Sequence, residues 1–350
     1  MLYTGPVIDG HLHVGTWFDA NGKDFYTGFD EIAARRGVKA LNIAALPIGE
    51  WGTENNIIAA LYKLHNPSVY IHGGLTYPEY PVRELPCGAE PKRQYEEMME
   101  LGFDGIKILE TKPEYHIQID NPVDREFYEP YFAAMEADGT HILWHVCDPD
   151  SFWDRDRIPP EHIANGWFYG EGGYASFEEI MGQVFNVLRR HPKLNITFAH
   201  FFFHSDWPEK LEDVFKEYPN VNVDITPGTE MYENFRDRHD AYREFFTRNA
   251  DRISFGTDTF FPEETDTLYN NVIRFLSTGE DVMIHRTPSR GLDLPEGVCR
   301  KILCENFQRK VSPAPKAMNV DAAKRYIEKY RGWIKNRAVF DLVEKELKKL

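Results

Sequence analysis

Cysteine, long apolar runs and an excess of basic residues are all lacking in this 350-residue sequence. Its cysteines, Cys87, Cys147, Cys299 and Cys304, are too far apart for a CxxC pair, and no apolar leader precedes them. We therefore expect reduced thiols in a cytoplasmic protein. Apolar stretches such as residues 40–48 are far shorter than the roughly 20 residues of a membrane-spanning helix.

Positive charge is scarce as well. Lysine and arginine total 40, against 56 aspartate and glutamate residues, and they are scattered along the chain. Nucleic-acid binding needs a basic surface that neutralises phosphates, so this class of function is excluded. Hydrophobic residues make up 42% and charged residues 27% of the chain, which excludes disordered and collagen-like proteins.

Eight short runs rich in valine, isoleucine and phenylalanine recur, and a longer helix-like stretch follows each. The runs are residues 7–13, 40–46, 69–75, 104–109, 141–146, 195–200, 221–226 and 253–258. Their mean spacing of about 35 residues matches a strand, a crossover helix and two loops. An open doubly wound sheet would need a glycine-rich turn after its first strand, where this chain has His11 and His13. The pattern predicts a (β/α)₈ TIM barrel.

Sequence signals also mark helices between the strands. Ser176 and Glu179 form a capping box at the start of an amphipathic run that ends in Arg189-Arg190. Residues 90–102 and 124–139 each end at a glycine, which is typical of a helix C-terminus.

Two segments depart from the even repeat. Residues 148–173 form a long insertion after the fifth strand, and their aromatic residues indicate an ordered lid rather than disorder. Residues 321–350 show helical spacing, and we expect helices packed on the barrel or on a partner subunit. We therefore predict a barrel domain over residues 1–310 and a C-terminal helical extension over residues 311–350. A homodimer would bury the aromatic residues of this tail, as would packing within one chain.

Polar side chains follow several of the predicted strands, at the end of the barrel where active sites lie. His11 and His13 alternate along the first strand and so point to the same side. The other strand-end residues of this kind are Lys107, His145, His200 and Asp258. Imidazole nitrogens and a carboxylate that converge suit a divalent cation, and we predict zinc, with manganese or iron as alternatives.

Taken singly, each of these residues has a simpler interpretation. A His-x-His pair arises often by chance, and a lone strand-end histidine is more often a hydrogen-bonded core residue. Asp258 could cap a helix, and Lys107 could reach solvent. The joint occurrence of the four histidines and Asp258 at the ends of strands one, five, six and eight favours a metal site.

These residues also resemble a known family, the amidohydrolase-related branch (family 2) of the amidohydrolase superfamily. The similar motifs are Asp9-Gly10-His11-Leu12-His13, Gly105-Ile106-Lys107, His145, Ala199-His200 and Phe255-Gly256-Thr257-Asp258. The resemblance covers roughly residues 5–310. It implies that His11, His13, His145 and Asp258 hold one divalent metal, with His200 beside it as an acid/base or electrostatic partner.

Two arrangements of Lys107 occur in the family that this sequence resembles. In some members the corresponding lysine is carbamylated and bridges two metals, and the histidine at the position of His200 becomes a ligand. In others the lysine stays an amine and meets a substrate anion. We favour one metal and a free amine.

Further residues are candidates for substrate contact. They are His72, Trp153, Arg155, Arg157, Trp167 and Tyr169. The arginines could clamp a carboxylate or form salt bridges within the lid. The aromatic residues could cover the site or anchor the lid, and His72 could line the pocket or be structural.

The predicted function is a metal-dependent hydrolase in which an activated water attacks a small ester, lactone or amide. The predicted catalytic residues are Asp258, His200 and Lys107. The alternative is a metal-dependent non-oxidative decarboxylase of an aromatic or unsaturated carboxylic acid, which the resemblance also allows. A non-catalytic binding protein is a third possibility, but all five candidate ligand positions are filled.

Overall fold

The computed structural model describes residues 1–14, 25–48, 52, 54–77, 89–228 and 230–350. The prediction for Cys87 lies outside these residues. The other three cysteines, Cys147, Cys299 and Cys304, are free and buried. Among the helices of the described part, none is long and apolar enough to cross a membrane.

Eight parallel strands form one sheet in which each strand pairs with the next along the chain. The strands are β1 Val7–Leu12, β2 Val38–Ala44, β3 Tyr70–Gly73, β4 Gly105–Thr111, β5 His141–Val146, β6 Asn195–Phe198, β7 Val221–Asp224 and β8 Ile253–Ser254. Beyond β8 the chain returns to β1, where the Gly10 amide donates to the Phe255 carbonyl over 3.0 Å and the His13 amide to the Thr259 carbonyl over 2.9 Å. The predicted TIM barrel is confirmed.

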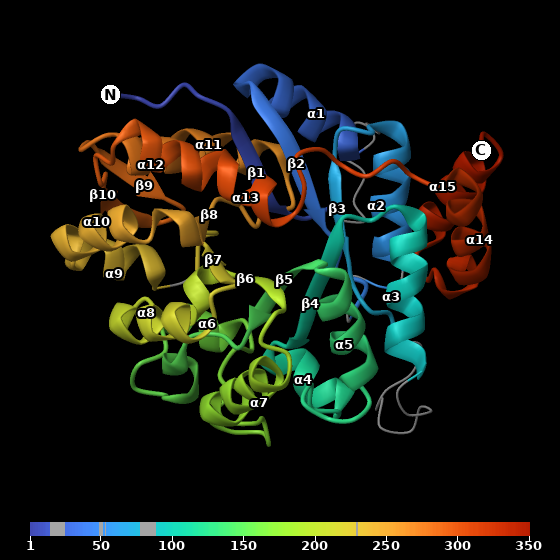
Figure 1. The fold of residues 1–350 in the computed structure, drawn as a ribbon, viewed down its shortest axis with the longest axis horizontal. Helices are drawn as coiled ribbons and strands as arrows, with labels where there is room; N and C mark the ends of the chain where they lie inside the picture. Colours follow the sequence, from blue (N-terminus) through green and yellow to red (C-terminus); the bar gives the residue numbers. More distant parts are fainter. Residues whose placement is uncertain (15–24, 49–51, 53, 78–88, 229) are drawn as a thin grey trace.

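Helices surround this barrel on the outside (Figure 1). Those that follow strands β1 to β6 are α1 Phe25–Arg36, α2 Glu54–His65, α3 Ala89–Leu101, α4 Pro113–Ile119, α5 Glu129–Asp138, α6 Pro160–Ala164, α7 Phe177–Arg190 and α8 Pro208–Glu217. The later ones are α9 Met231–Asp237, α10 His239–Arg248, α11 Pro262–Ser277, α12 Glu296–Arg300, α13 Asn306–Lys310, α14 Val320–Tyr330 and α15 Arg337–Leu347.

The local helix signals act as expected. Ser176 and Glu179 form the reciprocal capping box of α7. Gly102 and Gly139 follow α3 and α5 with φ of 92° and 66°, a left-handed conformation that glycine adopts without steric cost. The predicted helix over 124–139 begins later, at Glu129. Pro130 lies in its first turn, where a proline ring and a missing N–H are tolerated, whereas a helix that began at residue 124 would place this proline in its interior.

One element was not predicted. Strands β9 (Asp281–Ile284) and β10 (Thr287–Arg290) form a small antiparallel hairpin between α11 and α12. Its strands have only four residues each and are largely exposed, so no apolar alternation marks them in the sequence.

The lid and the C-terminal extension both pack on the barrel. The lid contains a short 3₁₀ helix, η3 (Asp150–Trp153), and α6, and its own buried cluster includes Phe152, Ile158 and Tyr169. In the C-terminal extension, α14 packs against α2 and α3, as the red helices show in Figure 1. The division of the chain at residues 310/311 stays a prediction.

Candidate metal centre and active site

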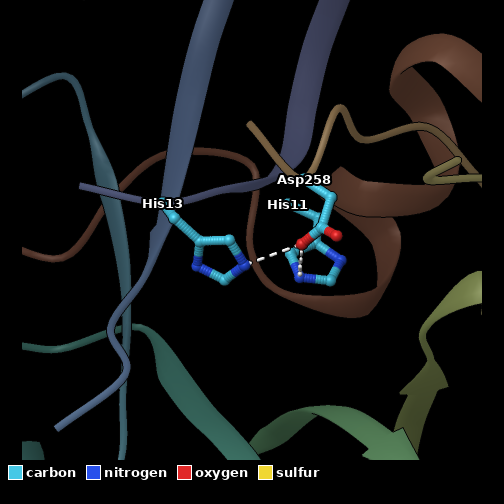
Figure 2. A group of neighbouring side chains, drawn as sticks. All are labelled: His11, His13 and Asp258. Atoms are coloured by element: carbon cyan, nitrogen blue, oxygen red, sulfur yellow. Dashed lines mark hydrogen bonds and ion pairs between the residues drawn. The ribbon is translucent and has the colours of Figure 1, made fainter. Parts of the chain in front are cut away.

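His11, His13 and Asp258 meet at the carboxyl ends of the strands (Figure 2). The two histidines come from the end of β1, and Asp258 lies in the loop after β8. One carboxylate oxygen, Asp258 Oδ1, lies 2.8 Å from His13 Nε2 and 3.3 Å from His11 Nε2. Of the described residues, these three form a group whose potential ligand atoms all lie within 4.8 Å of one another.

The hydrogen bonds behind the two imidazoles orient them for metal binding. His11 Nδ1 lies 2.8 Å from Asp224 Oδ2, and His13 Nδ1 lies 2.7 Å from the Ala44 carbonyl oxygen. Since both partners are acceptors, each Nδ1 carries the proton and donates. Each Nε2 then presents its lone pair to the cluster. Carboxylates and backbone carbonyls orient metal-binding histidines in this way, so the residues present fit a divalent cation.

His145 and His200 lie beside this group. The His200 ring is 5.8 Å from that of His11 and 4.9 Å from that of His145, and His200 Nε2 lies 3.7 Å from Asp258 Oδ2. His145 Nε2 lies 2.8 Å from the Cys147 carbonyl oxygen, which leaves Nδ1 as its available ligand atom. Five residues of the sequence-predicted centre therefore share one mouth of the barrel, although three of them form its tight core.

The backbone at this mouth is strained. His200 begins a left-handed turn, η4 (His200–Phe203), in which all four non-glycine residues have φ between 50° and 57°. Asp258 has φ of 57° and does not cap a helix, since α11 begins at Pro262. Such conformations cost about 1 to 3 kcal/mol each and are concentrated at functional sites. The left-handed turn at His200 explains why β6 ends at Phe198, whereas β8 already ends at Ser254, four residues before Asp258.

Burial sets the charge states that metal ligands require. Desolvation, together with the nearby Lys107 cation, lowers the pKa of His11 to about 3, and desolvation lowers that of His145 to about 4. Burial opposes ionisation of Asp258, but the surrounding His200 and His11 hold its pKa well below the usual value. At neutral pH these imidazoles are therefore neutral and the carboxylate is ionised, as cation binding requires.

Lys107 also reaches the centre. Its Nζ atom lies 2.9 Å from His11 Nε2, the ring atom that faces the cluster. Burial lowers the pKa of this amine to about 8. Lys107 is thus close enough to contact any group bound at the cluster.

A cavity of about 950 Å³ opens above these side chains. His13, Lys107, His145, His200 and Asp258 line its floor. Phe260, stacked on the His13 ring at 4.8 Å, and Trp167, which lies under the Lys112 ammonium at 5.3 Å, form parts of its wall. The cavity is large enough for a small organic molecule.

The aromatic residues of the lid have two different roles, since one lines the cavity and two fix the lid in place. Of the three predicted contacts, Trp167 lines the cavity. Tyr169 instead donates from its hydroxyl to Asp148 Oδ2 over 2.7 Å, and Trp153 donates from Nε1 to the Ala175 carbonyl over 2.9 Å. These two side chains hold the lid in place.

The predicted arginine clamp does not line the cavity. Arg155 pairs with Glu171 at 3.3 Å and Arg157 with Asp150 at 2.9 Å, and Arg157 lines a neighbouring hollow instead. Neither guanidinium lines the cavity floor or wall. Both arginines instead form ion pairs within the lid, which was the alternative interpretation.

His72 likewise lies away from the cavity, inside the barrel below the centre. Its Nδ1 is 2.7 Å from Asn42 Oδ1 and its Nε2 is 2.7 Å from His141 Nδ1. The space for this ring exists because Gly105 has no side chain, and a Cβ there would lie 2.3 Å from His72 Nε2. His72 is therefore part of a buried hydrogen-bonded chain in the barrel interior.

Two polar residues near the centre were not predicted from the sequence. Asp224 ends β7 and binds His11, so the rule that selected the other strand-end residues would have found it. Lys112 donates to Asp148 Oδ2 over 2.7 Å and also pairs with Glu114 at 3.0 Å. It follows β4 in a loop, where a lysine carries no distinct signal.

A parallel (β/α)₈ barrel with imidazole and carboxylate ligands at its carboxyl mouth defines the class of metal-dependent barrel enzymes. Within this class, the amidohydrolase family model matches residues 8–309. The chain belongs to the amidohydrolase family, whose members are enzymes that generally bind a divalent metal.

Solved structures show the same fold. One is an uncharacterised TIM-barrel protein from Bordetella bronchiseptica, with 15% identity and a TM-score of 0.56 over 91% of this chain and 99% of that chain. Another is 2,6-dihydroxybenzoate decarboxylase complexed with 2,6-dihydroxybenzoate, with 15% identity and a TM-score of 0.53 over 87% of this chain and 98% of that chain. A search of curated proteins finds no match.

Proposed function

We propose that the protein is a metal-dependent hydrolase of a small ester, lactone or amide. One observation carries the proposal: the Nε2 atoms of His11 and His13 converge on Asp258 Oδ1 at the floor of a cavity. His145 Nδ1 would complete the ligand set, and we propose zinc as the cation. When bound, such a cation lowers the pKa of water from 15.7 towards about 7 and polarises a carbonyl.

The chain's own groups provide for the proton transfers. Asp258 Oδ2, which is not engaged by His11 or His13, is positioned to accept the proton of the attacking water. His200 holds its Nδ1 towards the Thr226 carbonyl at 3.2 Å, so its Nε2 faces Asp258 and the cavity. From there it can pass that proton to the leaving group or, once protonated, stabilise a developing oxyanion.

The charges around the cavity limit how many anionic groups a substrate can carry. Lys112 is paired with two carboxylates, those of Asp148 and Glu114, and Arg155 and Arg157 are paired with carboxylates of the lid. Among the described lining residues, Lys107 is then the one cation without a carboxylate partner within hydrogen-bond distance. This cation lies at the cluster, where it can polarise an acyl oxygen, and the described lining provides no second free cation for a carboxylate elsewhere on the substrate.

Decarboxylation is the second candidate, and the position of Lys107 is the observation that favours it. Its amine lies at the cluster, where it could meet the carboxylate that is to be lost as CO₂. A panel of lactones, anilides and hydroxybenzoates separates the two reactions, because hydrolysis of a lactone or anilide releases acid or amine and decarboxylation releases CO₂. Acid or amine release without CO₂ supports the hydrolase.

The central test is the substitution Asp258→Asn. Loss of the proton acceptor and of a ligand oxygen should lower kcat by about 10² to 10⁴-fold, since general base catalysis contributes that much. The matched control is Asp293→Asn, the same change at an exposed residue with φ of 45° that lies away from this cavity. Full activity of Asp258→Asn, or an active wild type that holds no metal by elemental analysis, would contradict the proposal.

A further inference from the structure

The carboxylate of Asp224 lies behind the centre and contacts two of its residues, His11 and His200. Its side chain, at the end of β7, is 2% exposed. Oδ2 accepts from His11 Nδ1 over 2.8 Å. Oδ1 accepts from the His200 amide over 2.9 Å, from the Thr226 amide over 3.1 Å and from the Thr226 hydroxyl over 2.5 Å.

Thr226 extends this contact to the second imidazole. Because its hydroxyl donates to Asp224, the Oγ1 lone pairs are left to accept from His200 Nδ1, which lies at 3.1 Å. The Thr226 carbonyl oxygen lies at 3.2 Å from the same nitrogen. The proton of His200 is thereby held on Nδ1, and Nε2 faces the cavity.

Asp224 also holds strained backbone. His200 is the first residue of the left-handed turn η4, a conformation that non-glycine residues rarely adopt. Its amide is fixed by Asp224 Oδ1, on the neighbouring strand β7. Without this acceptor, the amide at the start of the turn would be buried and unpaired, and the turn that aims His200 would lose its anchor.

We propose that Asp224 is the positioning residue of the centre, which sets the orientation and the protonated nitrogen of both His11 and His200. This inference rests on the proposed function, because the centre it orients is the proposed cation site. Asparagine cannot replace Asp224, since its side chain has one oxygen. The NH₂ group of asparagine would face either the Nδ1–H of His11 or the backbone N–H of His200. One of these two donors would therefore lose its acceptor.

The test compares Asp224→Asn with the wild type, using full-length protein stripped of metal and titrated with Zn²⁺. Loss of an acceptor behind a ligand imidazole should weaken Zn²⁺ binding by about 10 to 100-fold. The matched control is Asp104→Asn, an equally buried carboxylate that precedes β4 at the opposite end of the barrel and binds Lys63 and the Ile71 amide. It should lower the melting temperature and leave Zn²⁺ affinity within about three-fold.

A second readout does not depend on metal. Imidazole ¹H–¹⁵N spectra of the metal-free wild type should show protonated Nδ1 atoms on both His11 and His200, and Asp224→Asn should lose or shift at least one of them. Thr226→Val, which removes only the hydroxyl relay, should change the His200 signal and leave that of His11 unaltered. This variant keeps the inference testable if Asp224→Asn fails to fold.

The outcomes separate the two proposals. A wild type that binds no Zn²⁺ would overturn the metal-dependent function, while the imidazole spectra would still decide the role of Asp224. A wild type that binds Zn²⁺ together with Asp224→Asn of equal affinity and unchanged Nδ1 signals would overturn the positioning role. Equal changes of the His11 and His200 signals in Thr226→Val would contradict the inference that Asp224 binds His11 directly and reaches the His200 ring through Thr226.

Discussion

Individual histidines in this protein differ in function although several share the same strand-end position. His11 and His13 have their Nδ1 atoms bound from behind, and their Nε2 atoms face the cluster, where Lys107 Nζ and Asp258 Oδ1 lie. His72 has both ring nitrogens engaged, by Asn42 and His141. The difference lies in what the second nitrogen faces, since the Nε2 atoms of His11 and His13 share one carboxylate oxygen whereas that of His72 faces another buried imidazole.

His72 leads to a prediction on acid stability. Burial, followed by the neighbouring His141, lowers the pKa of His72 well below its ordinary value of 6.5. The folded protein thus keeps this ring neutral at a pH where the unfolded chain takes up a proton, so lower pH favours unfolding. Below about pH 6, this one group should reduce the free energy of unfolding by about 1.4 kcal/mol per pH unit.

The measurement is urea denaturation of wild type and His72→Gln from neutral pH to about pH 4.5. The wild-type curve should fall more steeply, so the gap between the two free energies should narrow as pH falls. At about pH 8 the imidazole is neutral in both states, and the difference there gives the packing cost of the substitution alone. Parallel curves over the whole range would show that His72 does not stay neutral on folding.

Among the elements, the lid is joined to the barrel in part through the carboxylate of Asp148. Asp148, just after β5, accepts from Tyr169 of the lid over 2.7 Å and from Lys112 of the loop after β4 over 2.7 Å. The neighbouring Lys112 and His145 hold the pKa of Asp148 below its ordinary value despite burial, so the carboxylate stays ionised and accepts both bonds. The lid is therefore held by a charge-assisted hydrogen bond close to the centre.

Removing that bond should loosen the lid. Tyr169→Phe deletes one hydrogen bond to a charged group, worth about 1.5 to 3 kcal/mol, or about 10 to 150-fold in an equilibrium constant. Because the hydroxyl touches no residue of the metal cluster, we expect a rise in KM of this size with little change in kcat, together with faster proteolysis within residues 148–173.

Tyr174→Phe is the control, because it removes a hydroxyl from a ring that follows the lid and packs against Tyr169 at 5.0 Å. It should leave KM and proteolysis close to those of the wild type. A fall in kcat in Tyr169→Phe with unchanged KM would place the hydroxyl in the chemical step instead of in the lid.

Across the whole molecule, stability and chemistry reside in different regions. The C-terminal helix α14 packs against α2 and α3, far along the chain from the cluster. Its Tyr326 hydroxyl accepts from Asn56 Nδ2 over 3.1 Å, and its Tyr330 hydroxyl donates to Glu97 over 2.9 Å. The extension thus covers helices on the outside of the barrel, whereas the centre lies at the carboxyl mouth.

Ile327→Ala tests this separation. Ile327 is fully buried on α14, and truncation of such a side chain costs about 2 to 5 kcal/mol. We expect a lower melting temperature with Zn²⁺ affinity and kcat unchanged at a temperature where the variant is folded. Val320→Ala, at an exposed position of the same helix, should change stability by less than about 0.5 kcal/mol. Loss of Zn²⁺ binding in folded Ile327→Ala would show that the extension shapes the centre.

Local patterns of the sequence sufficed for the architecture and for most residues at the mouth, although Asp224 was missed. The eight apolar runs specify strands because burial on both faces demands continuous apolar residues, and the residues that end them reach one mouth in any parallel barrel. The end of β6 lies two residues before the predicted one, because a left-handed turn begins at His200.

Only the tertiary structure decided which of those residues act together. Asp224 and His11 are 213 positions apart, and their hydrogen bond follows from barrel closure, which no local signal encodes. Arg155 and Arg157 form ion pairs within the lid, and His72 is held inside the barrel by Asn42 and His141 from other strands. The period of a strand or helix is a local property of the chain, whereas the hydrogen-bond partner of a polar side chain depends on how distant segments pack.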